Sequence, residues 1–129
     1  MDLQYFRVME FIELTIDDSA VIVPLAHKLR PAADPAQLKE YLAEMFGFPT
    51  FYCFGLRQEG KLIAVSFGWI TVRFYSGKQL EVDNVIVDPD LRSQGVGKRF
   101  FSFIEQWAVQ QGSISRKFHR NGRNAKKIC

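Results

Sequence analysis

The chain has 129 residues, 47% of them hydrophobic, which suits one domain with a single core. Its net charge of +3 is uneven: residues 113–129 carry six lysines and arginines and no acid, whereas the residues before them hold 11 cations against 14 acids. No apolar stretch reaches the ~20 residues of a membrane helix and no secretory signal is visible, so we expect a cytoplasmic protein without a membrane partner.

The first segments predict a strand and then a helix. Residues Phe6–Leu14 are rich in Phe, Val and Ile, which is typical of a strand. The side-chain oxygens of Asp17–Ser19 can cap a helix, and apolar residues follow at helical spacing as far as Leu29. Pro24 interrupts this pattern, so we expect a kink there or a helix that begins near Pro24 itself.

A second helix is predicted next, and its ends are well marked. Asp34 is a good N-cap, Pro35 suits the first helical position, and Gln37 can complete a capping box. Gly47 can end the helix as a left-handed cap. Five apolar residues share one face, which we predict to be core: Leu38, Tyr41, Leu42, Met45 and Phe46.

Three strands joined by tight turns follow, and they predict an antiparallel meander. The strands are expected at Phe51–Leu56, Leu62–Phe74 and Gln79–Val87. Gly60 supplies the positive backbone angle of the first turn, and residues 76–78 form the second. A helix then begins at Gly95 and ends by Gly112, and a short strand at Ser113–Phe118 is compatible with the remaining pattern.

The cysteines and histidines predict neither a disulfide framework nor a metal site. Cys53 lies in an apolar run, as expected of a small buried residue, and Cys129 is the last residue. His27 and His119 are far apart and have no metal-ligand spacing with either cysteine. We therefore expect a protein without a metal.

The segment between the fourth predicted strand and the last helix carries the chemistry. The strand ends before Pro89, and the helix begins a few residues later. Amide groups at a helix N-terminus lack partners and lie at the positive end of the helix dipole. Gly95 and Gly97 let a ligand approach the backbone closely, and Arg92 and Lys98 add positive charge. The pattern predicts a loop that binds a pyrophosphate.

Two other glycine-rich loops fit less well. A dinucleotide-binding loop has Gly-x-Gly-x-x-Gly after the first strand, whereas here the glycines follow the fourth strand and the third glycine is absent. A Walker loop needs a hydroxyl residue after Gly-Lys, and Arg99 stands at that position. The pattern Arg-x-x-Gly-x-Gly alone is frequent by chance. The strands and helices around it therefore decide which kind of binding loop it indicates.

In this context the segment Val87–Gly97, Val-x-Pro-x-x-Arg-x-x-Gly-x-Gly, resembles the acetyl-CoA motif of the GNAT N-acetyltransferases. The two helices and the meander before it match the family's order as well, and the resemblance covers about residues 4–112. It implies an α+β fold with a mixed, mostly antiparallel central sheet flanked by helices, in the order β-α-α-β-β-β-α-(β). It also implies an enzyme that transfers an acetyl group from acetyl-CoA directly to a primary amine.

The resemblance further implies which residues bind acetyl-CoA. The loop amides hold the CoA pyrophosphate, and the end of the preceding strand, which splays from its neighbour, pairs with pantetheine and the acetyl carbonyl. The residues concerned are Val85, Ile86, Val87, Arg92, Ser93, Gln94, Gly95, Val96, Gly97 and Lys98.

Direct transfer to an amine requires a general base. Glu81 and Asp83 lie at i and i+2 and so share a face of the strand. Glu81 stands where several members of the family place their base, and Asp83 is the second candidate. The alternative is that both are solvent-facing acids on a half-exposed sheet.

The sequence departs from the family after Gly112. The family continues with a fifth strand, a fourth helix that often brings an Asn and a Tyr, and a terminal hairpin; the Tyr protonates the CoA thiolate. The 17 residues that follow here are basic and contain no tyrosine. We expect a core at residues 1–112 and a short basic tail at 113–129, as in a C-terminally truncated or altered member that lacks this helix and hairpin. An exposed sheet edge would then favour a homodimer.

Two other functions remain open. A catalytically degenerate homologue would bind CoA without transferring acetyl, which the missing tyrosine favours. A nucleic-acid-binding protein could use the six cations of the tail on phosphates. The acidic body and the single aromatic residue of the tail, Phe118, argue against nucleic acid.

Overall fold

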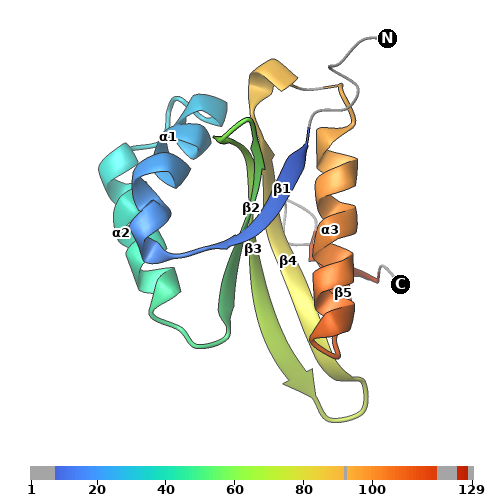
Figure 1. Cartoon of the computed structure of the whole chain (residues 1–129). Coiled ribbons are helices and arrows are strands. Elements are labelled where there is room, and N and C mark those ends of the chain that lie inside the picture. Colours follow the sequence, from blue (N-terminus) through green and yellow to red (C-terminus); the bar gives the residue numbers. More distant parts are fainter. Residues whose placement is uncertain (1–7, 92, 119–124, 128–129) are drawn as a thin grey trace, which may run out of the picture.

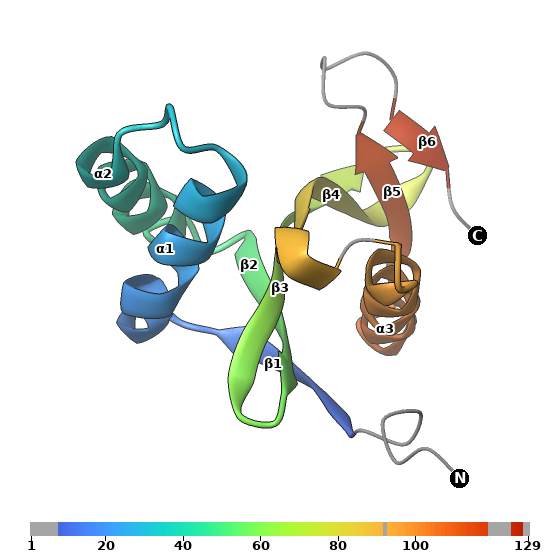
Figure 2. The ribbon, with the colours of Figure 1, turned by 90° about the horizontal axis from the view of Figure 1, so that it is seen from above.

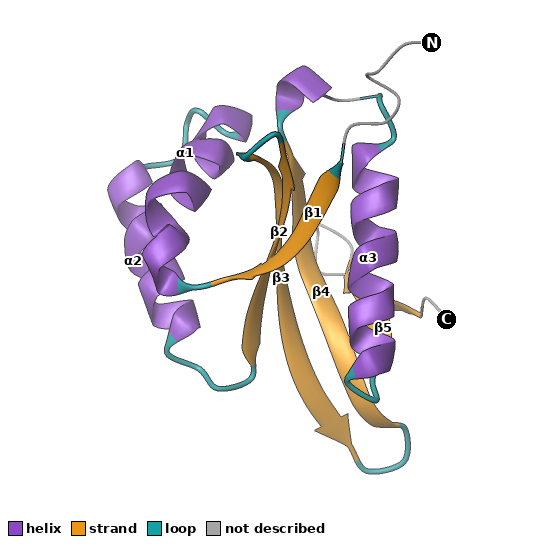
Figure 3. Ribbon diagram, viewed as in Figure 1, coloured by secondary structure: helices purple, strands orange, loops and turns teal. Residues whose placement is uncertain are grey.

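The computed structural model describes residues 8–91, 93–118 and 125–127 of the chain. A six-stranded sheet has α1 and α2 on one face and α3 on the other (Figures 1, 2 and 3). The elements, in chain order, are β1 Met9–Leu14, α1 Ser19–Leu29, α2 Pro35–Phe46, β2 Phe51–Gln58, β3 Lys61–Arg73, β4 Gly77–Val87, α3 Val96–Gln110, β5 Ile114–Phe118 and β6 Ala125–Lys127.

The sheet is mixed and mostly antiparallel, as expected. Strands β1 to β4 pair antiparallel in chain order, β5 joins β4 in parallel, and β6 returns antiparallel to β5. The β2–β3 turn has positive φ at Glu59 (54°) and Gly60 (76°), the conformation that matches the twist of a two-residue hairpin. Strand β6 is an addition, because the sequence predicted no strand after Phe118.

Helix α1 begins earlier than its proline suggests. A short 3-10 helix, Ile16–Asp18, precedes it, and Thr15 and Asp18 form a capping box there. Helix α1 then runs from Ser19 to Leu29 with Pro24 inside it, so a helix start near Pro24 is wrong. Expected strand residues 6 and 7 lie outside the described part of the chain, and β1 begins at Met9.

Helix α2 confirms its predicted start and corrects its predicted end. The Asp34 carboxylate accepts a hydrogen bond from the amide of Ala36 at 3.0 Å, with proline in the first turn. Gln37 does not complete a capping box; its amide donates to Glu40 instead. Gly47 is right-handed, with φ −72°, because its N–H bonds to Glu44 and closes the last turn without a left-handed residue.

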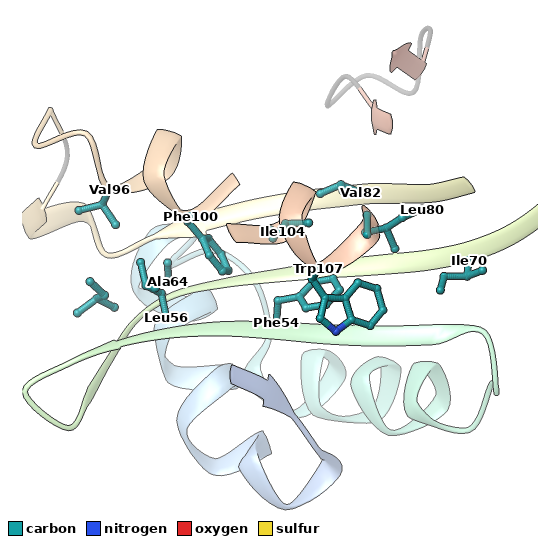
Figure 4. Packing of buried hydrophobic residues seen from close by; sticks show 12 residues of the cluster. Phe54, Leu56, Ala64, Ile70, Leu80, Val82, Val96, Phe100, Ile104 and Trp107 are labelled. Atoms are coloured by element: carbon teal, nitrogen blue, oxygen red, sulfur yellow. The ribbon is translucent and has the colours of Figure 1, made fainter. Parts of the chain in front are cut away.

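The main core lies between the sheet and α3. Phe100 and Ile104 of α3 are fully buried against Phe54 of β2 and Leu80 of β4 (Figure 4). Trp107 packs its ring against that of Phe54, with ring centroids 4.8 Å apart. This packing fixes the position of α3, and so of its N-terminus, relative to β4.

A smaller core lies on the opposite face, beneath α1 and α2. It contains Leu14, Ile22, Leu25, Leu42, Phe51, Cys53 and Val65. Burial raises the pKa of the Cys53 thiol to about 12, so the thiol stays protonated and is a poor nucleophile. The prediction of a small buried residue at position 53 is confirmed. Among the helices that the structure describes, none is both long and apolar enough to cross a membrane.

Candidate active site

In the described part of the chain, the second half of β4 has a neighbouring strand on one side only. Residues Val85, Ile86 and Val87 pair with β3, opposite Ser66, Val65 and Ala64 respectively. Pairing with β5 covers only residues 79–82, so within the described residues no strand adjoins the other side of 83–87. Backbone N–H and C=O groups on that side are therefore available to a ligand.

A bulge at Asn84 marks the point where the two strands part. The β3–β4 register shifts there, and Asn84 adopts a left-handed conformation with φ 56°. The Ser66 hydroxyl donates to the Asn84 carbonyl oxygen at 2.9 Å and holds the bulge in place. A bulge bends its strand, which is consistent with β4 turning away from β5. The bulge was not predicted from the sequence, although the dipeptide Asp83-Asn84 is unfavourable in a strand and asparagine tolerates positive φ.

The loop after β4 leads to a helix start without a side-chain cap. Residues Ser93 and Gly95 have positive φ, 69° and 75°, and Gly95 is the N-cap of α3. Within the part of the chain that the structure describes, no side-chain cap hydrogen bond is present at this N-terminus. Gly97 lies beside the end of β4, since a Cβ added to it would be 3.6 Å from Val87 Cγ2. The uncapped amides and the one-sided end of β4 are therefore neighbours, as the resemblance implies.

Most of the predicted cofactor residues lie in these two features. Ser93, Gln94, Gly95 and Lys98 are exposed, whereas Val96 is buried in the core. Arg92 lies outside the described residues. Val85 and Val87 are half-buried against the α3 core, and Ile86 is half-buried against the smaller core, so the proposed cofactor contacts are those of their backbone.

A cleft of about 830 Å³ lies between β4 and the two N-terminal helices. Its volume is in the range of small-molecule sites. Residues 82–86 line it from β4, and apolar side chains form most of the remaining wall: Ile22, Val23, Ala26, Leu29, Leu38, Leu42, Met45 and Phe67. Among the described residues, its charged lining side chains are Arg30 and Asp83. No pattern in the sequence predicted this cleft.

The prediction that one face of α2 is core is confirmed for Leu42, and Met45 and Phe46 pack against the same smaller core, but this face also borders the cleft. Leu42 is buried, but Leu38 and Met45 are half-buried and Tyr41 is 55% exposed. All four line the cleft. Helical spacing identified the face correctly, but it could not distinguish a face that packs on a sheet from one that borders an open cleft.

The two candidate bases have different surroundings. Both side chains are on the α1 and α2 face of β4, but only Asp83 lines the cleft. Glu81 forms an ion pair with Arg73, 2.9 Å apart, and its side chain is 13% exposed. Asp83 is half-buried, and this burial raises its pKa. No group of three or more His, Cys, Asp or Glu side chains suited to a metal occurs in the described ranges.

Comparisons with known proteins agree with this arrangement. The sequence profile of the Acetyltransferase (GNAT) family matches residues 22–126. A GNAT family acetyltransferase from Staphylococcus aureus superposes with a TM-score of 0.75 at 16% identity, covering 94% of this chain and 95% of that one.

Two further structures have the same fold. An aminoglycoside N-acetyltransferase in complex with CoA has a TM-score of 0.69 at 16% identity, covering 84% of this chain and 74% of its own. The ribosomal-protein-alanine N-acetyltransferase of Brucella melitensis also has a TM-score of 0.69 at 16% identity, and the match covers 84% of this chain and 77% of that one. No curated protein matches the sequence. The chain belongs to the Acetyltransferase (GNAT) family.

Proposed function

We propose that the chain transfers an acetyl group from acetyl-CoA directly to a primary amine. The observation that carries this proposal is the end of β4. Among the described residues it is paired on one side only, and it lies beside an N-terminus of α3 that has no side-chain cap. This arrangement offers a row of backbone groups next to an anion-binding helix end. Membership of an acetyltransferase family supports the same chemistry.

The backbone would bind acetyl-CoA in two parts. The amides of residues 93–98, together with the charges of Arg92 and Lys98, hold the pyrophosphate at the positive end of the α3 dipole. The free backbone groups of Val85, Ile86 and Val87 pair with pantetheine and with the acetyl carbonyl. A cytoplasmic location is part of the same proposal, since acetyl-CoA is an intracellular metabolite.

The amine would react from the cleft, with Asp83 as the general base. The Asp83 carboxylate removes a proton from the ammonium group, and the free amine attacks the thioester carbon. The new C–N bond forms as the C–S bond breaks, and the C–S electron pair leaves with the CoA sulfur. The nitrogen then loses its second proton, which the CoA thiolate accepts, and Asp83 returns the first proton to solvent. The raised pKa of Asp83 suits a base that must accept this proton. Glu81 is the second candidate, but its side chain is already engaged in an ion pair with Arg73.

The lining of the cleft favours an amine on an apolar body. Aliphatic and aromatic side chains form most of the wall, and Asp83 provides one negative charge for an ammonium group. A polycation would need more acids than the single one that the described lining residues provide.

Acetyl-CoA is expected to stabilise the fold by mass action. At about a hundred times its Kd, the gain in unfolding free energy is about 2.7 kcal/mol, which raises Tm by several degrees. A thermal-shift titration with acetyl-CoA and CoA measures this, with ATP as the control for nonspecific binding of a phosphate-rich nucleotide. No shift at millimolar acetyl-CoA, with the fold intact, would remove the basis of the proposal.

Release of the CoA thiol over a panel of apolar amines then tests transfer itself. Stabilisation by acetyl-CoA without thiol release from any amine would favour the second candidate, a homologue that binds CoA and does not catalyse.

A homodimer is also part of the proposal. The unpaired side of residues 83–87 is a sheet edge, and such an edge can pair with a second copy about a two-fold axis. Light scattering should then give about twice the 14.9 kDa chain mass, and acetyl-CoA should reduce this association because it needs the same backbone groups. A chain mass of 14.9 kDa throughout the micromolar range would rule the dimer out.

A further inference from the structure

The loop between β4 and α3 begins in a cluster of two carboxylates and two lysines. The Lys28 ammonium lies 2.8 Å from Asp88 Oδ1 and 2.7 Å from Asp90 Oδ2. Lys61 Nζ lies 3.7 Å from the other oxygen of Asp88. The two negative charges are therefore balanced by two positive charges.

Asp88 fixes the path of the chain at this point. Its side chain is 3% exposed, and Oδ1 also accepts the Asp90 amide at 3.0 Å. Its own N–H donates to the Ile63 carbonyl, and its carbonyl accepts from Leu91. The hydrogen bond from the Lys28 ammonium lowers the pKa of Asp88, because it stabilises the charged form of the carboxylate.

Lys28 joins this loop to the wall of the cleft. It belongs to the last turn of α1, and its neighbours Ala26 and Leu29 of that helix line the cleft together with the C-cap residue Arg30. The short 3-10 helix that contains Asp90, Pro89–Leu91, lies between α1 and α3 (Figure 2, light orange). The cluster thus connects the acceptor side of the molecule with the segment that leads into Gly95.

The charge of this cluster matters because a pyrophosphate would bind a few residues further along the chain. Two uncompensated carboxylates there would oppose the α3 dipole and repel the anion. We propose that Lys28 is a positioning residue for acetyl-CoA: it cancels the charge of Asp88 and Asp90 and fixes the start of the loop to α1. This inference rests on the proposed function, since it assumes that the loop binds the CoA pyrophosphate.

Lys28→Met tests the inference, because methionine keeps the apolar stem and removes the charge. The Kd for acetyl-CoA is expected to rise by about fivefold or more at an ionic strength of about 0.01 M, where the screening length is about 30 Å. The ratio of variant to wild-type Kd should approach one at about 0.5 M salt. Lys28→Arg should retain affinity. Lys39→Met is the matched control, an exposed lysine of α2 for which the described residues provide no ion pair.

Asp90→Asn separates a charge effect from a purely structural contact. Asp90 is 73% exposed, and its loss leaves Lys28 paired with Asp88. The charge account expects Asp90→Asn to bind acetyl-CoA as tightly as the wild type or more tightly. It also expects Lys28→Met/Asp90→Asn, which is neutral again, to recover most of the lost affinity. If the contact between Lys28 and Asp90 acts only by holding the loop in place, Asp90→Asn and the double variant should both bind acetyl-CoA more weakly than the wild type.

The outcomes are distinct. If wild-type protein does not bind acetyl-CoA, the proposed function fails. If wild-type protein binds and Lys28→Met binds equally at low salt, or Asp90→Asn binds more weakly than wild type, this inference is wrong. Should Lys28→Met fail to fold, the Lys28→Arg and Asp90→Asn comparisons still decide the matter.

Discussion

Replacing Gly97 with valine is expected to raise the Kd for acetyl-CoA by at least about 100-fold. The pyrophosphate must approach the first amides of α3 closely, and a branched side chain at Gly97 would occupy that space. Loss of two charge-assisted hydrogen bonds, at about 1.5–3 kcal/mol each, is enough for this effect. Isothermal titration calorimetry with acetyl-CoA measures it.

The structure makes Gly97 a better test position than Gly95. A Cβ at Gly97 would meet Val87 Cγ2 at 3.6 Å, an ordinary contact, and valine is the better helix former. Gly95 has φ 75°, so a valine there would be strained whether or not a ligand binds. Ser102→Val, on the exposed side of the same helix, is the matched control and should bind normally. If a folded Gly97→Val binds acetyl-CoA like the wild type, the loop is not the site.

Replacing Asp83 with asparagine is expected to lower kcat by about 10²–10⁴ if its carboxylate is the base. The Kd for acetyl-CoA should hardly change, because the backbone of Val85–Val87 remains. Glu81→Gln is the matched control, the same chemical change two residues away. It should reduce kcat little, and loss of the Arg73 ion pair should cost at most about 1 kcal/mol of stability. Loss of turnover in Glu81→Gln, with Asp83→Asn active, would reverse the assignment.

The pH dependence follows from the direction of the Asp83 pKa. Burial raises it, and a base works only when deprotonated, so kcat should fall on acidification at a higher pH than an ordinary aspartate would give. The folded state binds this proton more tightly than the unfolded chain does. The charged form therefore costs stability above the folded pKa, and the cost disappears as the pH falls below it. Asp83→Asn should accordingly raise Tm at neutral pH while it lowers kcat, which thermal denaturation would measure.

Local chemistry made the order of elements predictable. The Asp34 cap, the Gly60 turn and the one-sided apolar pattern of α3 each depend on residues close together in sequence. The binding loop before α3 could be predicted for the same reason, because Gly95 and Gly97 follow the end of the strand within a few residues. Such short-range signals need no knowledge of the tertiary structure.

The features that sequence reasoning missed depend on contacts between distant residues. Lys28 meets Asp88 across 60 positions of the chain, and the bulge at Asn84 is held by Ser66 of the neighbouring strand. One face of helix α2 borders a cleft as well as the sheet, and helical periodicity cannot distinguish these two environments. Helix α1 continues through Pro24, and it follows directly on the short 3-10 helix that Thr15 caps. Tertiary packing and a cap outside the helix overrode local preference in these cases.

The central claim is that acetyl-CoA binds to the backbone of the β4 end and the α3 start. Titration of ¹⁵N-labelled protein with acetyl-CoA, followed by backbone amide chemical shifts, tests this directly. The largest changes are expected at Val85–Val87 and at residues 93–98, with little change in the β2–β3 turn at Glu59 and Gly60. Changes concentrated elsewhere, or saturation without any change at residues 93–98, would contradict the account.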